Sequence, residues 1–458
     1  MSILLKNVID FIYLEIAKFI GLFSQKVQSK LYQNMRSKKF REIAKYAYIN
    51  SIYYRKLFEQ KGIFLNDIDN TNIENFPVIK KKDMIDNMQN VYTKKELIND
   101  EVSRFIYDTD NTKLRFKNNY LCFTTSGTLG VKLPIIIHFK DFLTFVISMF
   151  YYNSKPYKCF FGFKTKVAIL GLIEGRSAAV TLIKNLSKKI YRTKEISIIM
   201  PIDKIIAELN DFMPEQVISY PGVFLSLIKH KKNGFLKINP KKIILSGEVL
   251  TDENFLKIKE AFKCELTNSY GSSECITIGR KTFVDKDYEL FNNMCLLEIL
   301  DENNNAVPAG KQGRVIVTNF YNFSQPFIRY DTGDLAIKYE DKYGNLIFKG
   351  VAGRNYKPII FSNNLGIKEE IFHWSFYTLV LYSEGISKSQ LLIGEDCFKV
   401  ILVGDNQSVS TCREKFEKLI SDLKFEKSVK MVVEKADDIL PELNGKIPFI
   451  KFEQNLIL

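Results

Sequence analysis

The sequence predicts an α/β protein with a large N-terminal domain and a smaller α+β domain at its C-terminal end. From residue 122 to about 275, short apolar runs bounded by turn residues alternate with segments of amphipathic helical spacing. This alternation is typical of a mostly parallel sheet covered by helices on both faces. Residues 1–110 are charged with helical spacing, whereas 285–350 contain short strand-like runs separated by Asn and Gly turns. We therefore expect a multi-layer N-terminal domain of mostly parallel sheets flanked by helices, with a β-rich subdomain.

Three apolar runs in the middle of the chain are expected to be buried parallel strands. They lie within 166–175, 215–222 and 241–248, and each leads into a segment with helical spacing. In such sheets ligands collect beyond the carboxyl ends of the strands. Turns follow the strands at that edge: Tyr220-Pro221-Gly222, Ser246-Gly247-Glu248 and Ser269-Tyr270-Gly271.

The last third of the chain predicts hairpins and then a separate small domain. Residues 296–320 carry turn signals at 303–305 and 310–313, and 338–350 read as a further hairpin. After residue 353 the pattern becomes strands at 390–405, a helix at 411–424 and a strand at 428–435. We place the boundary near 353–356, which gives an N-terminal domain of 1–353, with 1–110 as its helical leader, and a C-terminal domain of 354–458.

Composition excludes several classes of protein. The 458 residues are 46% hydrophobic and 26% charged, which is ordinary for a folded globular protein. Lys and Arg outnumber Asp and Glu by 66 to 52, so the net charge is +14. This excess fits solubility, attraction to polyphosphates or attraction to anionic lipid. No aromatic–basic module accompanies it, and we expect no nucleic-acid partner.

The cysteines and the N-terminus indicate a cytoplasmic protein. The seven cysteines form no Cys-x-x-Cys pair, and the three histidines are isolated, which favours free thiols over disulfides or a His-rich metal site. The apolar segment 1–23 is interrupted by Lys6, Asp10, Glu15 and Lys18, so it is neither a signal peptide nor a spanning helix. It either packs on its own domain or contacts the inner face of the membrane.

One loop has the composition of a phosphate-binding loop. The stretch CFTTSGTLGVKLP at 122–134 offers three hydroxyls between Thr124 and Ser126, two glycines and Lys132. Glycines allow backbone N–H groups to approach an anion closely, and hydroxyls add further donors. The spacing is not that of the Walker motif. From these residues alone, an ordinary strand-to-helix turn remains an equal alternative.

Four further short motifs each have a functional and a purely structural interpretation. In NSYGSSE (268–274), Tyr270 can face a purine and Glu274 can hold a hard cation, but such turns are common. In RYDTGD (329–334), Asp334 can accept hydrogen bonds from ribose hydroxyls or cap its own turn. Arg354 in a Gly-Arg pair, and Lys446 in PELNGKI (441–447), supply cations or are simply solvated.

Taken in order, these motifs resemble the adenylate-forming superfamily, and in particular its phenylacetate–CoA ligase branch with related proteins of capsular-polysaccharide biosynthesis. The motifs run from 124 to 446 and so cover most of the chain. The resemblance implies an ATP- and Mg²⁺-dependent ligase. A carboxylate attacks the α-phosphorus of ATP, pyrophosphate leaves, and a nucleophile, by family default coenzyme A, takes the acyl group from the adenylate.

The resemblance also implies roles for individual residues. Lys446, Glu274 and Thr125 would be catalytic, with Glu274 holding Mg²⁺. Tyr220, Pro221, Gly222 and Gly247 would line the acyl pocket. The small C-terminal domain would swing as a lid between half-reactions. Binding of ATP would involve Thr124, Thr125, Ser126, Gly127, Thr128, Gly130, Lys132, Ser246, Gly247, Glu248, Ser269, Tyr270, Gly271, Ser272, Ser273, Asp334, Arg354 and Lys446.

Three departures from the family pattern bear on the reaction: the first removes a phosphate donor, and the other two put coenzyme A in doubt as the acceptor. Leu129 stands where a second threonine is usual, Tyr356 replaces a common aspartate at the domain joint, and 358–367 lack a glycine-rich run. The acyl acceptor is therefore either coenzyme A or an amine or hydroxyl of a surface glycan. A scaffold of polysaccharide assembly that binds nucleotide without catalysis is the alternative of another class. Only Cys275 and Cys295 lie where relatives carry a zinc site, so we expect no zinc, and a homodimer is common among relatives.

Overall fold

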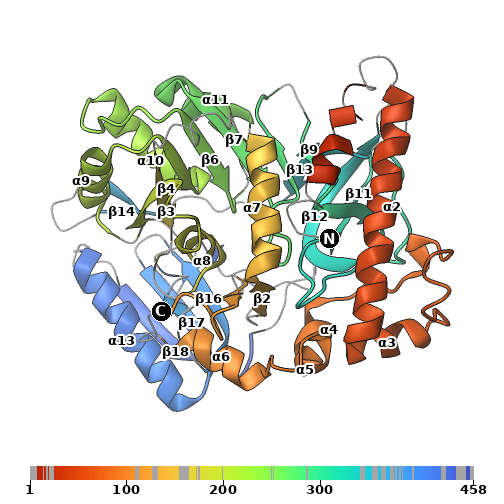
Figure 1. Ribbon diagram of the computed structural model, residues 1–458. Helices are drawn as coiled ribbons and strands as arrows, with labels where there is room; N and C mark the ends of the chain where they lie inside the picture. Colours follow the sequence, from red (N-terminus) through yellow and green to blue (C-terminus); the bar gives the residue numbers. More distant parts are fainter. Residues whose placement is uncertain are drawn as a thin grey trace.

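The computed structural model describes residues 8–13, 15–16, 19, 25–108, 113–125, 133–153, 164–171, 173, 176–198, 200–248, 250, 252–284, 287–340, 346–352, 359–362, 368–371, 376, 379–380, 383, 385–394, 397–423, 430–439 and 450–453. They confirm the predicted α/β class. A helix-covered, mostly parallel sheet, a separate antiparallel sheet and a small α+β unit follow one another along the chain (Figure 1).

The N-terminal region is helical, as predicted. Ser51 separates α2 from α3: its hydroxyl accepts a hydrogen bond from Tyr54 N and so caps the start of α3. Tyr54 and Phe58 then face the core. The elements are α2 (Gln25–Asn50), α3 (Ile52–Glu59), the 3₁₀ turn η1 (Ile73–Asn75), α4 (Lys81–Asp86), α5 (Met88–Val91) and α6 (Asn99–Tyr107).

A two-stranded antiparallel sheet and a long helix connect this region to the main sheet. Strand β1 (Tyr120–Thr124) pairs with β2 (Pro134–His138), and α7 (Phe139–Asn153) follows directly. All five residues of β1 are buried. The pairing of Thr124 with Pro134 closes the sheet at the loop singled out in the sequence.

The main sheet has seven strands in the order β4-β3-β5-β6-β7-β8-β9. The first five are parallel, and β8 and β9 continue the sheet antiparallel. Its strands are β3 (Thr165–Gly171), β4 (Tyr191–Ser197), β5 (Gln216–Ser219), β6 (Lys242–Ser246), β7 (Glu265–Tyr270), β8 (Gly279–Lys281) and β9 (Glu289–Leu290). The helices between them are α8 (Ala178–Lys184), α9 (Ile202–Phe212), α10 (Pro221–Lys232) and α11 (Asp252–Phe262). The three predicted buried runs are therefore β3, β5 and β6.

Local sequence explains where these helices begin and end. Ser177 caps α8 by accepting a hydrogen bond from Val180 N, and Pro221 starts α10, where its missing N–H costs nothing. Asp252 and Glu253 lie in the first turn of α11, where negative charge is favourable. Met213 ends α9 with a left-handed backbone at φ 47°.

The predicted β-rich subdomain is an antiparallel sheet in the order β10-β11-β12-β13. Its strands are β10 (Cys295–Leu300), β11 (Gln312–Asn319), β12 (Tyr330–Glu340) and β13 (Leu346–Ala352). Both predicted hairpins are confirmed, because β10 pairs with β11 and Glu340 pairs with Leu346.

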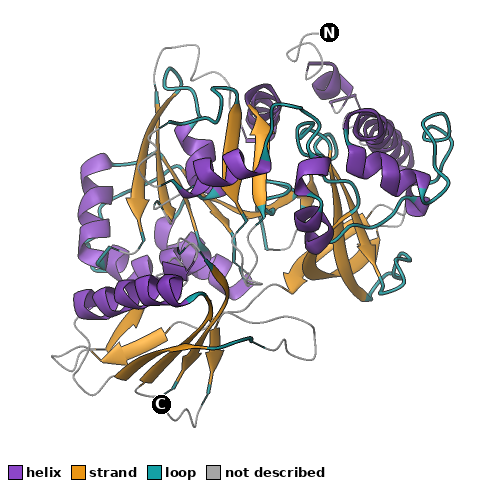
Figure 2. Cartoon of the chain, turned by 90° about the horizontal axis from the view of Figure 1, so that it is seen from below, coloured by secondary structure: helices purple, strands orange, loops and turns teal. Residues whose placement is uncertain are grey.

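The C-terminal unit is a second small sheet with one long helix. The order is β18-β17-β16-β19, and Figure 2 shows α13 running alongside this sheet. Its elements are β16 (Ile386–Ile393), β17 (Cys397–Gly404), α13 (Asn406–Leu423), β18 (Lys430–Lys435) and β19 (Ile450–Phe452). The hairpin β14 (Ile359–Ser362) and β15 (Lys368–Ile371) precedes it. The proposed domain boundary near 353–356 lies outside the described residues.

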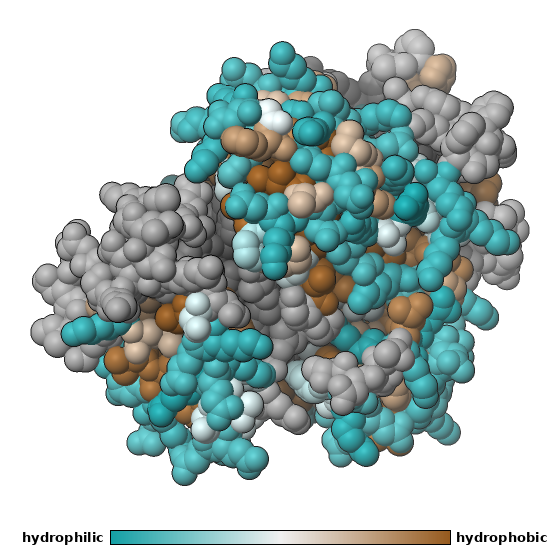
Figure 3. All heavy atoms as spheres, turned by 90° about the vertical axis from the view of Figure 1, so that its left-hand side faces the viewer, coloured by the Kyte–Doolittle hydropathy of each residue, from teal (hydrophilic) through white to brown (hydrophobic). Residues whose placement is uncertain are grey.

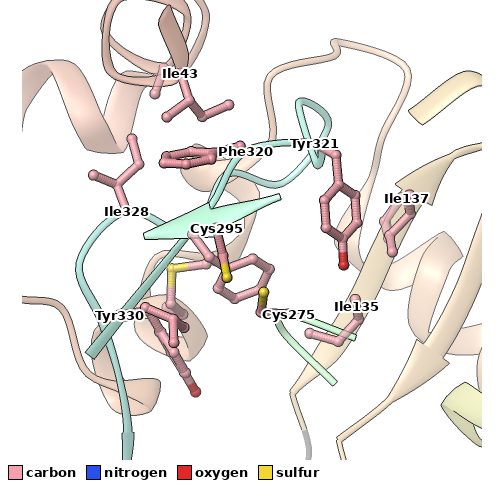
Figure 4. Packing of buried hydrophobic residues seen from close by; sticks show 14 of the residues in the cluster. Ile43, Ile135, Ile137, Cys275, Cys295, Phe320, Tyr321, Ile328 and Tyr330 are labelled. Carbon is pink, nitrogen blue, oxygen red and sulfur yellow. The ribbon is translucent and has the colours of Figure 1, made fainter. Parts of the chain in front are cut away.

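Two clusters of buried apolar side chains hold these layers together. One joins the N-terminal helices to β1, β2 and the antiparallel sheet, and the other joins the main sheet to the C-terminal unit. In the first, Phe76 receives the ring edges of Phe40 and Phe58 at centroid distances of 5.0 and 5.1 Å. Figure 4 shows the same cluster around Cys275 and Cys295, whose side chains lie beside each other.

The surface is mixed in character. Hydrophilic residues predominate on the face that Figure 3 shows, with apolar side chains between them. No helix within the described ranges combines the length and the apolar character that crossing a bilayer requires.

Candidate functional site

The carboxyl ends of three adjacent parallel strands bring the predicted turns to one edge of the main sheet. Strands β5, β6 and β7 end at Ser219, Ser246 and Tyr270, and neighbouring residues pair in register, as Ser219 does with Leu245. Strand β3 lies between β4 and β5. The chain passes from β3 to β4 on one side and then crosses to β5 on the other side, so strand order reverses between β3 and β5. Ligands of α/β sheets bind at such a point.

Tyr220 lies over this crossover point. Its side chain is half-buried, and removal of its phenol from water raises the pKa of Tyr220, with the carboxylate of Glu248 adding to the effect. A Cβ atom built on Gly247 would lie 2.9 Å from Tyr220 Cε1, and Gly247 itself has φ +87°. Only glycine allows both this backbone conformation and this close approach of the ring.

Glu248 holds the start of the next helix. Its Oε2 accepts a hydrogen bond of 2.8 Å from Gly222 N, which is among the first N–H groups of α10. Because the N-terminal N–H groups of a helix have no partner within it, a carboxylate there is stabilising. The contact ties the turn after β6 to the turn after β5. The proposed acyl-pocket residues 220–222 and 247 therefore lie together.

Tyr270 and Asp334 connect the main sheet to the antiparallel sheet. Tyr270 Oη donates a hydrogen bond of 3.0 Å to Asp334 Oδ2, across 64 residues of sequence. Burial and the negative charge of Asp334 raise the pKa of Tyr270, which keeps the phenol protonated and able to donate. Strand β12 is irregular before Asp334, where its register with β11 shifts; Gly333 has φ +74°, and Gly333 N donates a hydrogen bond to Asp331 Oδ1.

A second tyrosine–carboxylate pair lies beside the first. Tyr330 Oη donates a hydrogen bond of 2.7 Å to Glu274 Oε1, and both residues are buried. Burial, followed by the charge of Glu274, raises the pKa of Tyr330. Asn319 Nδ2 donates to the backbone carbonyl of Glu274 at 2.9 Å. Side chains from two strands of the antiparallel sheet thus fix both the backbone and the carboxylate of Glu274.

The turn between Tyr270 and Glu274 is tightly folded. A Cβ atom at Gly271 would lie 2.1 Å from the carbonyl oxygen of Ile276, so no other residue fits there without moving the backbone. Ser272 donates through its N–H to Cys275 O and accepts through Oγ from Cys275 N. Ser272 is therefore engaged in the turn itself. Ser246, Ser269 and Ser273 also lie at this edge, half-buried.

The described start of the predicted phosphate loop is anchored on both sides. Thr124 N donates to Arg176 O, and Thr125 forms a backbone hydrogen bond with Leu133 across the base of the loop. Thr125 Oγ1 accepts a further hydrogen bond from Leu133 N at 3.0 Å. The remaining predicted loop residues, Ser126, Gly127, Thr128, Gly130 and Lys132, lie outside the described residues, as do Arg354 and Lys446.

A lysine from the helical leader region reaches the same threonine. Lys81, in the first turn of α4, places Nζ 2.9 Å from Thr125 Oγ1. It is half-buried, whereas the next residue, Lys82, is exposed. A cation is therefore positioned at the entrance of the loop from a segment 44 residues earlier in the chain.

A buried arginine fixes the strand that carries Tyr330 and Asp334. Arg329 is 1% exposed and forms a two-pronged ion pair with Glu298, with distances of 3.1 and 2.9 Å. Its remaining Nη1 donates to the carbonyl oxygens of Glu74 and Phe76. Arg329 has φ +47°, which is uncommon for a residue other than glycine. The helical leader region and the antiparallel sheet are thus joined immediately before the RYDTGD motif.

Glu274 offers a carboxylate of the kind that holds Mg²⁺ together with the phosphates of a substrate. Mg²⁺ is commonly held by one or two carboxylates together with substrate phosphates. Glu274 Oε1 accepts the hydrogen bond from Tyr330. Thr125, at the start of the predicted phosphate loop, belongs to the same N-terminal domain. Among the described residues, no three His, Cys, Asp or Glu side chains gather as a metal site of their own. The absence of zinc stays a prediction.

Comparison with known proteins agrees with this architecture. No protein-family model matches the chain. A search of solved structures finds 2-hydroxyisobutyryl-CoA ligase with 2-HIB-AMP and CoA in the thioesterification state, at a TM-score of 0.56 and 16% identity over 92% of this chain and 89% of that one. Its open conformation gives a TM-score of 0.52 and 15% identity over 93% of this chain and 91% of that one. The chain has the fold of the adenylate-forming acyl-CoA ligases.

A curated sequence is similar as well. Protein CapK of Staphylococcus aureus is 24% identical over 342 residues, which are 70% of this chain and 67% of that protein. The resemblance inferred from the motifs thus agrees with the fold found by structural comparison.

Sequence reasoning missed three residues of this site. Lys81, Tyr330 and Arg329 act on Thr125, Glu274 and the RYDTGD strand through contacts between distant segments. The signal for two of them was present, because Arg329 and Tyr330 open the motif that was quoted for its aspartates. No local pattern distinguishes Lys81 from the lysines on either side of it.

Proposed function

We propose that this protein is an ATP-dependent, AMP-forming carboxylate ligase. In the first step an oxygen of the substrate carboxylate attacks the α-phosphorus of ATP. The bond from that phosphorus to the bridging oxygen breaks, and pyrophosphate leaves with the electron pair, so the product is an acyl-adenylate. Catalysis of this step consists mainly of positioning and of stabilising negative charge.

One observation carries the proposal: the two tyrosine–carboxylate pairs Tyr270–Asp334 and Tyr330–Glu274. They join motifs that are 64 and 56 residues apart at the carboxyl edge of the parallel sheet, where nucleotides bind in α/β folds. A structural protein has no need of two carboxylates held at this edge by buried phenols. The fold shared with acyl-CoA ligases supports the same proposal.

The roles proposed for the described residues follow from their places in the site. Asp334 accepts hydrogen bonds from the ribose, and Tyr270 orients its carboxylate while lining the adenine pocket. Thr124, Thr125 and Lys81 hold the outer phosphates. Tyr220 and Gly247 form the floor of the acyl pocket. Ser246, Glu248, Ser269, Gly271, Ser272 and Ser273 shape the turns on which the nucleotide rests.

Glu274 would hold Mg²⁺, which neutralises part of the triphosphate charge when it is bound. Tyr330 orients the carboxylate of Glu274 and Asn319 holds its backbone, so both are fixed by the protein itself. We assign two further roles to residues of the C-terminal unit. Lys446 would contact the α-phosphate, and Arg354 would reach the ribose. The 2-hydroxyisobutyryl-CoA ligase is described in open, postadenylation and thioesterification states. We accordingly propose that the C-terminal unit, 354–458, moves relative to 1–353 between half-reactions.

The acceptor of the acyl group is either coenzyme A or a nucleophile on a glycan or other metabolite. The CoA ligases of the same fold favour a thioester. The similarity to Protein CapK and the altered joint at Tyr356 favour an amide or ester in surface-polysaccharide biosynthesis. Both alternatives share the first half-reaction and a small-molecule carboxylic acid as substrate. Cytoplasmic ATP is available to either.

Pyrophosphate exchange tests the first half-reaction without knowledge of the acceptor. The full chain is incubated with ATP, Mg²⁺, labelled pyrophosphate and a panel of carboxylic acids that includes aryl, hydroxy and sugar acids. We expect label to enter ATP only when a suitable acid is present, and Glu274→Gln to abolish the exchange. A protein that binds ATP tightly but exchanges no label with any acid would instead be the non-catalytic scaffold. Candidate thiols, amines and glycans are then added to identify the acceptor.

A further inference from the structure

The N-terminal helical segment carries an exposed stripe of apolar side chains. Residues 8–13, 15–16 and 19 are helical. Val8, Ile9, Ile12 and Ile16 are 41%, 47%, 54% and 51% exposed, and Phe19 is 63% exposed. At about 100° per residue, the five positions fall within roughly 100° of arc on one side of the helix. Single exposed apolar residues are ordinary, but five on one face form a patch.

The opposite side of this helix is attached to the body. Asp10 Oδ2 receives a hydrogen bond of 2.6 Å from Lys39 Nζ, and both side chains are mostly buried. Tyr13 Oη donates to the backbone carbonyl of Leu31 at 3.0 Å, and Phe11 and Tyr13 pack against the core. The helix therefore rests on α2 through one side and holds the apolar stripe outward. Its orientation is set by the fold.

The first fifty residues of the chain are strongly basic in sequence. Residues 1–50 contain nine Lys and Arg (6, 18, 26, 30, 36, 38, 39, 41 and 45) against three acidic residues (10, 15 and 42), a net charge of +6. The whole chain has +14, so the other 408 residues contribute only +8. Lys30 is exposed and adjoins Leu31, the residue that Tyr13 contacts. Lys38 is exposed as well and adjoins Lys39, which pairs with Asp10, so two exposed lysines of α2 adjoin residues that the helix contacts.

We propose that this face is a docking surface for a bilayer that contains anionic lipid. An apolar stripe flanked by lysines is the composition of helices that lie in the interfacial plane of a membrane. The apolar side chains enter the acyl boundary, and the lysines meet the negative surface potential, where each contributes about 1 kcal/mol, or about fivefold in binding. A second protein would need matching acidic groups, whereas a bilayer supplies them without a specific arrangement. Glu15 lies at the edge of the stripe, where the side chain of a helix in the membrane interface can stay in contact with water and lipid headgroups.

The inference does not rest on the proposed ligase reaction. It concerns where the protein works, and it brings the site to substrates or acceptors attached to lipid. Vesicle binding is measured without nucleotide, so its failure would not touch the proposed chemistry.

Sedimentation with vesicles tests the surface in the full chain. Vesicles of phosphatidylcholine alone are compared with vesicles that contain about 30% phosphatidylglycerol. We expect strong binding only to the second kind, and weaker binding as salt shortens the range of electrostatic attraction. In the triple variant Ile9→Gln, Ile12→Gln, Ile16→Gln, the partition coefficient should fall at least about tenfold. The double variant Lys30→Gln, Lys38→Gln should lose affinity for the anionic vesicles alone.

A matched control separates this surface from general stickiness. Phe64, Phe235 and Leu256 are 54%, 63% and 55% exposed but lie elsewhere, and their triple replacement by Gln should leave vesicle binding unchanged. Thermal unfolding of all variants verifies the fold. Unchanged binding of the Ile variant, or no binding of the native protein to either vesicle, would overturn the proposal. So would a halved molar mass of the Ile variant in solution, since the stripe would then be the contact between two copies.

Discussion

The phenol of Tyr330, at the start of β12, donates a hydrogen bond of 2.7 Å to Oε1 of Glu274, which lies in the loop between β7 and β8, 56 positions earlier in the chain. The contact is buried, and the pKa of Tyr330 is raised by that burial and by the carboxylate it faces. A neutral donor therefore holds a charged acceptor in one orientation. This arrangement fixes the carboxylate to which we assign Mg²⁺ in the proposed function, and it links the antiparallel sheet to the carboxyl edge of the parallel one.

Tyr330→Phe should impair the use of Mg²⁺ more than the binding of the acid. Without its donor, Glu274 can rotate, so we expect the Mg²⁺ concentration for half-maximal pyrophosphate exchange to rise several-fold. Loss of a hydrogen bond to a charged group should also lower the free energy of unfolding by about 1.5–3 kcal/mol. A magnesium titration at saturating acid, together with urea unfolding, measures both effects.

The matched control for this variant is Tyr92→Phe. Tyr92 is equally buried, but its hydroxyl has no hydrogen-bond partner among the described residues. Removing it should leave the magnesium requirement unchanged and stability equal or slightly higher, because an unsatisfied buried hydroxyl is costly. If Tyr330→Phe behaved like this control, Tyr330 would have no role in positioning Glu274.

Gly247→Ala should affect the acid substrate in a way that backbone strain alone does not. Gly247 and Gly234 both have positive φ, at +87° and +80°, so an alanine at either position costs roughly 1–2 kcal/mol of strain. Only at Gly247 would the new Cβ meet a side chain, the ring of Tyr220 at 2.9 Å, whereas Gly234 has open space. We expect both variants to lose stability and only Gly247→Ala to change the KM for the acid. Equal KM values would place the acyl pocket elsewhere.

The sequence predicted well those features that arise from short stretches of chain. The apolar runs that became β3, β5 and β6, and the Asn and Gly turns of the antiparallel sheet, are determined by side-chain period and by turn chemistry within about ten residues. Because carboxyl ends of parallel strands share an edge, the grouping of Tyr220, Gly247 and Tyr270 followed from the same patterns.

Contacts between distant segments were not predictable in this way. The Tyr330–Glu274 and Lys81–Thr125 contacts span 56 and 44 residues, and no local period encodes which tyrosine or lysine will be the partner. The exposed stripe at 8–19 was similarly ambiguous, because an apolar segment reads the same whether it packs inward or faces outward. The structure resolves it by attaching Asp10 and Tyr13 to α2. The roles of Ser126, Lys132, Arg354 and Lys446 stay predictions.

Lys81→Met should weaken ATP binding while leaving the fold intact. Lys81 Nζ lies 2.9 Å from Thr125 Oγ1, at the base of the loop to which we assign the outer phosphates. Charge-assisted hydrogen bonds of about 1.5–3 kcal/mol predict a rise in the KM for ATP of about tenfold or more. Methionine keeps the length and apolar stem of the side chain. Lys82→Met removes an exposed neighbouring charge and serves as the control; similar KM values in the two variants would contradict the prediction.

Buried phenols and thiols should make the protein lose stability in alkaline solution. Burial raises the pKa of Tyr270 well above its ordinary value near 10, and raises that of the Cys264 thiol to about 11. A group whose pKa is raised by folding stabilises the native state fully below the pKa of the unfolded chain. That contribution is lost as pH rises toward the folded value, by up to about 1.4 kcal/mol per pH unit and group. We expect the unfolding free energy to begin falling near pH 9 and to fall more steeply above pH 10.

Tyr270→Phe removes one such group, so the difference in stability between it and the native protein should shrink as pH rises from 10 to 11. A difference that stayed constant over this range, measured by urea unfolding at each pH, would show that Tyr270 ionises alike in both states.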